Sequence, residues 1–273
     1  MKADIQTFDE DRQIEHAREN LIVKDNVLIQ NVSRQKFTLS VLQQKCLGYI
    51  ISKIKPTEEV PEWQRIEFDI RTFCEVCGIE KDNGGNYKYI KEALEQIADH
   101  HFWINDDKGE LLFQWITTPY INRETNKLTV DIAPRVLPYL CALKERFTQY
   151  ELWQILGLRG KYSTMIFEIC KSYAYRNPFT VSLDDLYKYL GVEGKYKEYK
   201  EFNRRVLTPA TTEINKYTSI NVSYEGIRDG RKIGYIKFTV ANKELWDGHE
   251  AYRRVTAELH GVKHQPGQMN LFE

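Results

Sequence analysis

The sequence predicts an α+β protein in which two units of the same layout follow one another along the chain. Three observations support this prediction. The chain has 273 residues, about the length of two domains. Hydrophobic residues make up 42% of it, which is enough for packed cores and is not typical of a disordered chain. Segments with helical and with strand periodicity alternate in the same order in both halves.

The first unit begins with a helix whose start is marked in the sequence. Ser40 and Gln43 form a capping box, and hydrophobic residues then recur at helical spacing over residues 41–54 until Pro56 ends the helix. The elements that follow are indicated by alternating residues, glycines and apolar faces: a strand over 65–70, a short helix over 71–77 closed by Gly78, a turn over 82–85, a helix over 86–99, and two strands over 111–116 and 128–132 around a polar loop over 122–127.

The second unit repeats this order. A helical stripe begins at Tyr162, and Ser182 with Asp185 resembles a capping box for a helix that ends before Gly191. The other elements are a short strand over 179–181, a long helix over 199–217, and strands over 220–224 and 233–240 joined by residues 226–231. The order helix, strand, helix, helix, hairpin is the layout of a winged helix, in which the third helix packs beside a two-stranded wing.

We therefore expect two tandem winged-helix domains. The division is an N-terminal arm over 1–34 with a short strand (21–23 and 27–29), a first domain over 35–148, a second domain over 149–245 and a tail over 246–273. Residues 134–157 form a helical link between the units. The tail is expected to begin as a helical stub and to continue as a flexible segment that contains Gly261, Pro266 and Gly267.

The distribution of charge points to one half of the chain. The formal net charge is zero, which excludes a uniformly basic nucleic-acid coat. Residues 158–240, however, carry 15 basic and 9 acidic side chains, whereas residues 1–157 carry 20 and 25. A basic segment of this kind is a candidate surface for nucleic acid. The alternative is a basic face that serves only solubility.

Compartment signals in the sequence are consistent with one another. No apolar run of about 18 residues predicts a membrane span, and the start Met1-Lys2-Ala3-Asp4 does not resemble a signal peptide. The five cysteines are odd in number and scattered, which argues against a disulfide scaffold. We expect a protein of a reduced cytoplasm with no membrane partner.

The long helix over 199–217 carries the main candidate site. At 100° per residue, with Val206 at the centre of the buried face, a polar stripe falls on the opposite side, with Arg205 on its flank. Arginine suits guanine, threonine suits phosphate or the thymine methyl, and lysine suits phosphate. Pro209 lies inside the helix, where it removes one backbone hydrogen bond. The alternative is an ordinary solvated face. The predicted DNA-binding residues here are Lys197, Lys200, Arg204, Arg205, Thr208, Thr211 and Asn215.

Two further basic groups are expected to contact the DNA backbone. The tip of the second hairpin holds Arg228, Arg231 and Lys232, which a wing would place on the flanking phosphates. In the first unit, Lys88 and Lys91 lie on the third helix, whose exposed side also carries acidic residues. We expect these two lysines to position phosphates rather than to read bases.

Several strings in these elements resemble the initiator Rep proteins of theta-replicating plasmids. The resemblance covers about residues 20–245, and its most specific part precedes the second wing. The strings are Phe37-Thr38-Leu39-Ser40, Ser182-Leu183-Asp184-Asp185-Leu186, Asn203-Arg204-Arg205-Val206-Leu207, Glu213-Ile214-Asn215 and Gly230-Arg231-Lys232.

The resemblance implies a function for each domain. It implies that two winged helices bind direct repeats (iterons) at a plasmid origin, promote opening of A·T-rich DNA and recruit the host replicative helicase and initiator. It also implies a monomer that starts replication and a dimer that represses its own promoter by binding its operator. The second domain would be the main sequence-specific one. The first would dimerise and make accessory DNA contacts.

The dimerisation surface is expected on the hairpin of the first unit. Residues 111–132 carry Phe113, Trp115 and Ile116, which is more apolar surface than one small wing needs. An exposed strand edge with such side chains pairs readily with a partner.

The C-terminus contains a short motif of its own. Gln268-Met269-Asn270-Leu271-Phe272-Glu273 resembles the peptide by which bacterial replication proteins bind the sliding clamp. Gln268 would donate and accept hydrogen bonds at a pocket rim, and Leu271 and Phe272 would be apolar anchors. The alternatives are that the two apolar residues fold back onto the second domain, or that the pattern is accidental.

The sequence contains no convincing catalytic or metal site. Cys74 and Cys77 have the spacing of a zinc knuckle but lack a second pair, and His100-His101 lacks the strand context of a nuclease motif. We therefore expect a protein that is not an enzyme and that needs no cofactor or metal. The alternatives left open are a nicking or joining replication enzyme that uses one of the 17 tyrosines, and a transcriptional repressor only.

Overall fold

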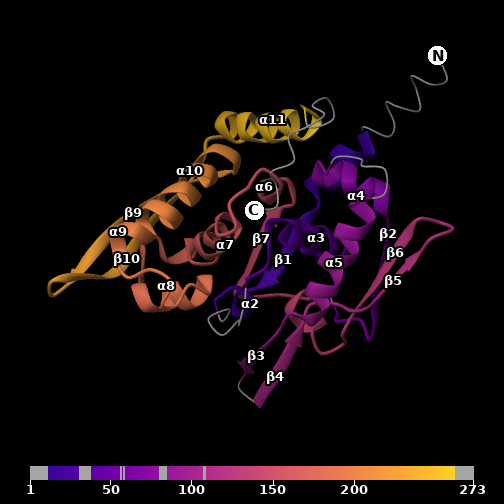
Figure 1. The fold of residues 1–273 in the computed structure, drawn as a ribbon, viewed down its shortest axis with the longest axis horizontal. Coiled ribbons are helices and arrows are strands. Elements are labelled where there is room, and N and C mark those ends of the chain that lie inside the picture. The colour runs from indigo at the N-terminus through magenta and orange to yellow at the C-terminus, as the bar shows by residue number, and fades with distance from the viewer. Residues whose placement is uncertain are drawn as a thin grey trace.

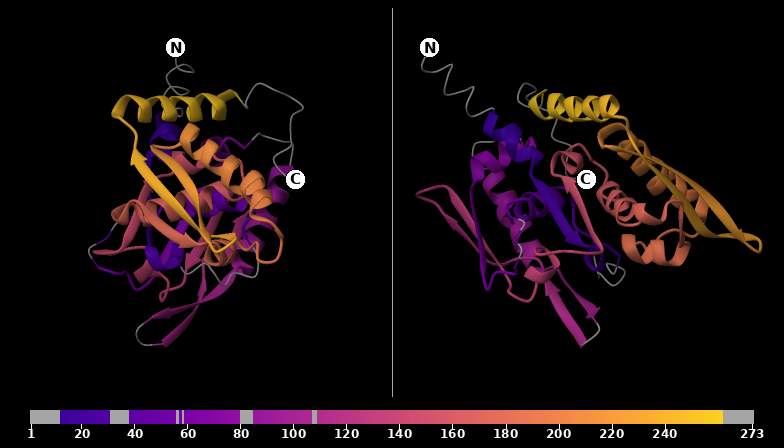
Figure 2. Two further views of the ribbon diagram at one scale, coloured as in Figure 1. Left: turned by 90° about the vertical axis from the view of Figure 1, so that its left-hand side faces the viewer. Right: turned by 180° about the vertical axis from the view of Figure 1, so that it is seen from behind.

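The computed structural model describes residues 12–30, 38–55, 57, 59–79, 85–106 and 109–261. It contains two units with a two-stranded ribbon between them and a C-terminal helix across one edge of both (Figures 1 and 2). The ribbon pairs β1 (Leu21–Asp25) with β7 (Phe147–Glu151), and the helix is α11 (Leu245–Gly261). The two-unit α+β architecture expected from the sequence is confirmed.

The first unit has the predicted helices and the predicted second wing strand, but its first wing strand lies later in the chain than predicted. It consists of α3 (Val41–Ile51), β2 (Gln64–Asp69), α4 (Ile70–Cys77), α5 (Gly85–Asp99) and a sheet in the order β2-β6-β5, with β5 at Thr117–Asn122 and β6 at Lys127–Ile132. Both expected local signals are present. Ser40 and Gln43 form the capping box, and Gly78 ends α4 in the left-handed conformation, with φ of 64°.

A second hairpin lies between α5 and the wing, and the sequence prediction missed it. It pairs β3 (His101–Asp106) with β4 (Gly109–Gln114), so the segment predicted as the first wing strand belongs largely to this hairpin. Phe113, Trp115 and Ile116, expected on an exposed edge, are buried at 0%, 5% and 0% exposure. The correction has a simple cause: Phe113 stacks on Phe102 at 5.1 Å and packs edge-on against Trp115 at 4.9 Å.

The N-terminal segment is part of the core. Residues 12–19 are helical, with Ile14, Ala17 and Arg18 buried, and β1 is followed by α2 (Asn26–Gln30) where the sequence had indicated a strand over 27–29. Arg18 donates hydrogen bonds to the carbonyls of Val76 and Glu75, both at 3.0 Å, and so caps the C-terminal end of α4.

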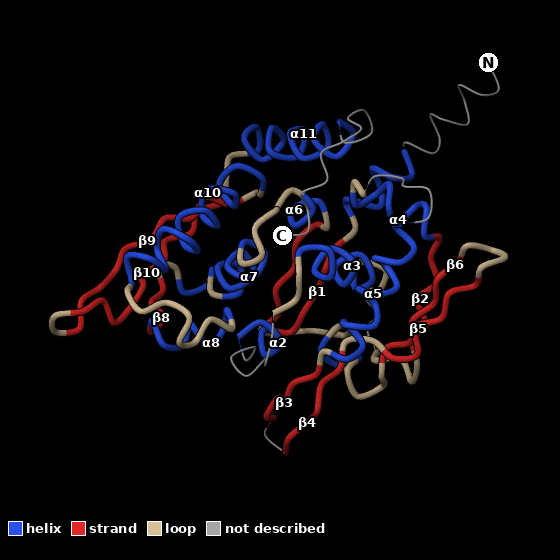
Figure 3. The backbone as a smooth tube through the Cα atoms, viewed as in Figure 1, coloured by secondary structure: helices blue, strands red, loops and turns tan. Residues whose placement is uncertain are grey.

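The second unit also follows the prediction in outline. It contains α7 (Ser163–Ser172), β8 (Phe179–Ser182), α8 (Leu183–Leu190), a long helix in three segments, and a sheet in the order β8-β10-β9. The link contains a short 3-10 turn, η2 (Leu137–Tyr139), β7 and α6 (Trp153–Leu156), and a second such turn, η3 (Ala174–Arg176), follows α7. The wing strands β9 (Ile220–Asp229) and β10 (Lys232–Asn242) are longer than expected and project from one end of the molecule (Figure 3).

Helix α11 joins the two units instead of forming a stub. Its buried residues are Ala251, Val255 and Leu259, and Leu259 packs so closely on Gly78 of the first unit that a Cβ there would lie 2.4 Å from its Cδ2. Glu258 accepts hydrogen bonds from Arg159 and from Tyr217, both at 2.8 Å. The helix therefore packs against both halves of the chain.

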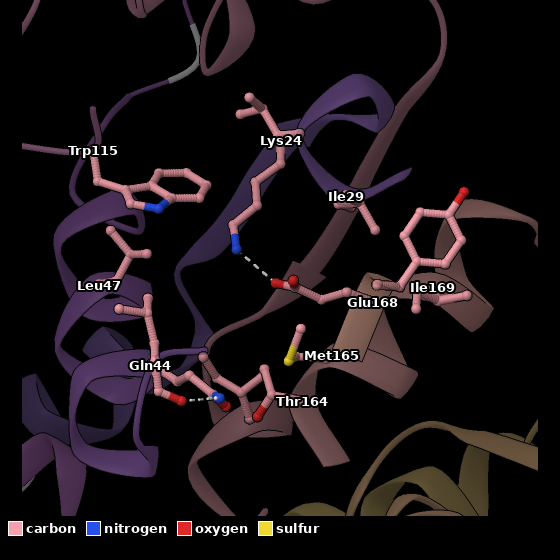
Figure 4. A pocket seen from close by; sticks show the side chains of 13 residues that line it. Lys24, Ile29, Gln44, Leu47, Trp115, Thr164, Met165, Glu168 and Ile169 are labelled. Atoms are coloured by element: carbon pink, nitrogen blue, oxygen red, sulfur yellow. Dashed lines mark hydrogen bonds and ion pairs between the residues drawn. The ribbon is translucent and has the colours of Figure 1, made fainter. Parts of the chain in front are cut away.

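Polar groups also connect the two units. Lys24 on β1 donates to Glu168 on α7 at 2.6 Å, and Gln44 on α3 donates to the carbonyl of Lys161 at 2.9 Å. The Lys24–Glu168 pair borders a small pocket whose other walls are mostly apolar, with Trp115 and Met165 among them (Figure 4). No helix in the described ranges is long and apolar enough to cross a membrane.

Candidate nucleic-acid interface

The third helix of the second unit changes geometry in its middle. It consists of α9 (Tyr199–Phe202), a π-helical segment η4 (Asn203–Leu207) and α10 (Thr208–Tyr217). The Thr208 N–H donates to the carbonyl of Asn203, five residues earlier. The wide turn lies directly before Pro209, which has no N–H and whose ring would press on the Arg205 carbonyl in a regular helix. We refer to these three segments together as the reading helix.

Most of the predicted polar stripe is exposed, with one exception. Lys197, Lys200, Arg204, Arg205 and Thr208 are exposed, although Lys197 lies in the bend before the helix begins. Thr211 is buried at 7% exposure, and its hydroxyl donates to the Leu207 carbonyl at 2.8 Å. The prediction failed at Thr211 because it assumed 100° per residue throughout. The π segment turns less per residue and rotates the later positions toward the core.

Asn215 holds the wing. It is exposed as predicted, but its amide accepts from the Val222 N–H at 2.6 Å and donates to the Val222 carbonyl at 2.9 Å. The side chain therefore joins α10 to β9. We assign Asn215 to holding the wing against the helix and no longer to base recognition.

The charged side chains of the stripe differ in whether they already form an ion pair within the protein. Arg205 forms an ion pair with Glu201 at 3.0 Å. The side chains of Arg204, Lys197 and Lys200 form no hydrogen bond or ion pair with any residue in the described part of the chain. Arg204 is thus an exposed guanidinium on the outward face of the reading helix, available for a bidentate contact with a guanine.

The wing presents its basic residues at its tip. Gly230, with φ of 62°, closes the turn, and the strands pair as Lys232 with Asp229 and Ile233 with Arg228. Arg228 is therefore at the end of β9 rather than in the loop expected over 226–231. Arg228, Arg231 and Lys232 are all exposed, and none forms an ion pair with another described residue.

The first unit presents a weaker basic surface. Lys88 and Lys91 are both exposed on α5, and Lys88 lies 3.9 Å from Glu92. The exposed face of α5 carries both basic and acidic side chains, as the sequence indicated. A role in positioning phosphates remains a prediction.

Candidate reactive groups are mostly buried. Cys46, Cys74 and Cys77 lie in the core. Burial raises the pKa of the Cys46 thiol to about 12, and burial also raises the pKa of the Cys77 thiol well above its ordinary value. His100 is buried and His101 begins β3. Within the residues that the structure describes, no three His, Cys, Asp or Glu side chains could hold a metal ion together. Gln268, Leu271 and Phe272 of the clamp-like motif lie outside the described residues.

Sequence reasoning missed two residues at this surface. Tyr224, on β9, donates a hydrogen bond to Asn203 in η4, and both are partly buried between wing and helix. The alternation of Val222 and Tyr224 along the strand was the signal that could have identified Tyr224, because alternate residues of a strand face the same side.

Comparison with family models and known proteins extends over most of the chain. A model described as "Initiator Replication protein, WH1" matches residues 21–171, and one described as "Initiator Rep protein, WH2" matches residues 182–240. An Escherichia coli "Replication initiation protein" is 25% identical over 196 residues, which cover 68% of this chain and 60% of that protein. An Escherichia coli "PI protein" is 28% identical over 169 residues, 54% of each. The chain thus spans 60% and 54% of the lengths of these relatives.

A solved structure has the same fold. The crystal structure of Pi initiator protein in complex with iteron DNA matches 83% of this chain and 99% of its own, with a TM-score of 0.69 and 20% sequence identity. The tandem winged-helix architecture predicted from the sequence is confirmed by this match and by the two family models.

Proposed function

Because this chain belongs to the initiator replication protein family, we propose that it is a plasmid replication initiator that binds direct repeats at its origin. The observation that carries the proposal is that one unit presents both Arg204, exposed on the reading helix, and a wing whose basic residues form no ion pair with other described residues. A relative of the same fold is a Pi initiator protein in complex with iteron DNA. Family and geometry therefore support the same activity.

In the proposed mechanism, binding rather than bond chemistry drives initiation. The reading helix enters a major groove, where Arg204 contacts base edges, while Lys197 and Lys200 contact phosphates. The wing then contacts the adjacent backbone. The second unit supplies most of the sequence specificity, and α5 of the first unit adds phosphate contacts through Lys88 and Lys91. Several molecules on tandem repeats deform neighbouring A·T-rich DNA.

Arg204→Ala is expected to weaken binding to the specific repeat by about 1–3 kcal/mol, the usual value of one bidentate base contact. Lys200→Ala should weaken specific and non-specific binding alike, since it removes a phosphate contact. The measurement is a footprint on the origin followed by gel-shift titration of one repeat and of a scrambled duplex. Unchanged affinity of Arg204→Ala for the repeat would contradict the proposed orientation of the helix. A wild-type protein without sequence preference would contradict the function.

The relatives do not favour the alternative of a nicking or joining enzyme, since their names describe initiation. We propose that the protein is not an enzyme. Recruitment of the host helicase and initiator, repression of its own promoter and action in the bacterial cytoplasm are further parts of this proposal and rest on the family. Clamp binding through Gln268, Leu271 and Phe272 rests on the sequence pattern alone.

A homodimer in equilibrium with the monomer is part of the proposal, with a surface different from the one first expected. The hairpin β3–β4 still supplies exposed apolar side chains. Trp103 and Leu112 face one another across it, at 52% and 45% exposure, and no further strand pairs with either β3 or β4 among the described residues. We propose this face as the contact between two copies of the chain.

Replacing Trp103 and Leu112 by lysine together should shift the protein from dimer to monomer in sedimentation at micromolar concentration, because the charges would have to be desolvated in the contact. Trp63→Lys is the matched control, since Trp63 has the same 52% exposure but precedes β2 on a different sheet. If the double variant stays dimeric, or if the control dissociates equally, the β3–β4 face is not the interface.

A further inference from the structure

A short chain of hydrogen bonds links the wing to the reading helix at the π segment. The Tyr224 hydroxyl on β9 donates to Oδ1 of Asn203 at 2.6 Å and lies 3.0 Å from Oγ1 of Thr208. Asn203 is the first residue of η4, and Thr208 directly follows its last. One tyrosine hydroxyl therefore contacts both ends of the wide turn.

The direction of these hydrogen bonds follows from the donors available. A tyrosine hydroxyl has one proton, and here that proton goes to Asn203. The Tyr224 oxygen must then accept the proton of Thr208. Tyr224 therefore occupies Oδ1 of Asn203 and the hydroxyl proton of Thr208, and it leaves the amide N–H groups of Asn203 and the hydroxyl lone pairs of Thr208 for other partners.

Tyr224 is one of three residues along β9 that contact the reading helix. Val222 is bound through its backbone by Asn215, and a Cβ on Gly226 would lie 3.3 Å from the Tyr199 hydroxyl. The contacts at residues 222, 224 and 226 follow one another along the strand, beside Asn215, the Asn203–Thr208 turn and Tyr199 of the reading helix. The strand and the helix thus lie along one another, as Figure 3 shows for β9 and α10.

The π turn also determines where Arg204 points. Arg204 follows Asn203 inside η4, and a return to regular α-helical geometry would rotate it relative to α10 and to the wing. We propose that Tyr224 is a positioning residue for base recognition. Its hydroxyl holds the π turn so that Arg204 and the wing engage the same stretch of DNA together. This inference rests on the proposed function, since it concerns the same DNA surface.

The test is Tyr224→Phe in the full-length chain, which removes the hydroxyl and keeps the ring. The probe is a duplex selected from a random-sequence pool by the wild-type protein, and a scrambled duplex measures non-specific binding. We expect the specific affinity to fall about tenfold, with non-specific affinity and melting temperature unchanged. Tyr235→Phe is the matched control, because Tyr235 is 42% exposed on β10 of the same wing and forms no side-chain hydrogen bond with a described residue. It should change neither affinity.

A double-mutant cycle separates positioning from direct DNA contact. If Tyr224 acts through Arg204, then Tyr224→Phe should change specific affinity less than about twofold in an Arg204→Ala background. Additive losses would overturn the inference, as would an equal loss of specific and non-specific binding or no loss at all. A wild-type protein that selects no sequence from the pool would contradict the proposed function itself, which is a distinguishable result.

Discussion

Lys24→Met is expected to lower the free energy of unfolding by about 3 kcal/mol, because it leaves a buried carboxylate without its partner. The Lys24 ammonium lies 2.6 Å from Glu168, and their side chains are only 8% and 14% exposed. Tyr150 also donates to Glu168, and burial together with the Glu168 charge raises the pKa of Tyr150 well above its ordinary value. One hydroxyl cannot replace the lost positive charge.

The measurement is urea-induced unfolding of the full-length chain. Lys127→Met is the matched control, since Lys127 pairs with Glu67 at the same 2.6 Å but both side chains are 51% exposed. It should change stability little, because exposed pairs contribute little. The double variant Lys24→Met with Glu168→Leu should regain part of the loss, since it removes the unpaired charge but leaves the buried Tyr150 hydroxyl without its acceptor. Equal losses of unfolding free energy in Lys24→Met and Lys127→Met would contradict the prediction, because the pair between β1 and α7 would then contribute no more than an exposed pair.

Neutralising Arg228, Arg231 and Lys232 together by glutamine should flatten the plot of log affinity against log salt by about 2–3 units. Each phosphate contact contributes a slope of roughly 0.9, so three lost contacts also reduce affinity on the order of 100-fold near physiological salt. The three side chains are exposed at the wing tip, and none is engaged by an acidic side chain in the described structure. Their full charge is therefore available to the DNA.

Fluorescence titration of a labelled duplex at several salt concentrations gives the slope. Lys237→Gln is the control on the same wing, because Lys237 already pairs with Glu225 at 2.7 Å. Its slope should stay close to that of the wild type. A triple variant with an unchanged slope would place the wing away from DNA and leave the reading helix as the only contact in the second unit.

Features that depend on neighbouring residues could be predicted from the sequence. The capping box at Ser40, the glycine ends of α4 and α8 at Gly78 and Gly191, and the wing turn at Gly230 all appear where expected. Caps and turns depend on a few adjacent residues, and amphipathic faces repeat with the period of their own helix. The same local signals were enough to predict that Arg204 is exposed and that the wing tip is basic.

Features that depend on contacts between distant residues could not be predicted from the sequence. The burial of Phe113 in the β3–β4 hairpin depends on Phe102, which stacks on it. The packing of α11 depends on the contact of Leu259 with Gly78, about 180 residues earlier in the chain. An alternating strand pattern indicates that one face is apolar, but it does not indicate which other element of the chain packs on that face. The expectation that Phe113, Trp115 and Ile116 lie on an exposed edge failed for this reason.

The sequence by itself determined the two-unit α+β fold, the location of the basic surface in the second unit and the outward face of Arg204. Only the tertiary structure decided how that surface is assembled. In the structure Thr211 is buried after the π turn, Asn215 forms hydrogen bonds with the backbone of Val222, and Tyr224 donates a hydrogen bond to Asn203. The physical reason is that periodicity reports the average rotation of a helix. The actual rotation at Asn203–Leu207 also depends on hydrogen bonds from a strand that follows about 20 residues later.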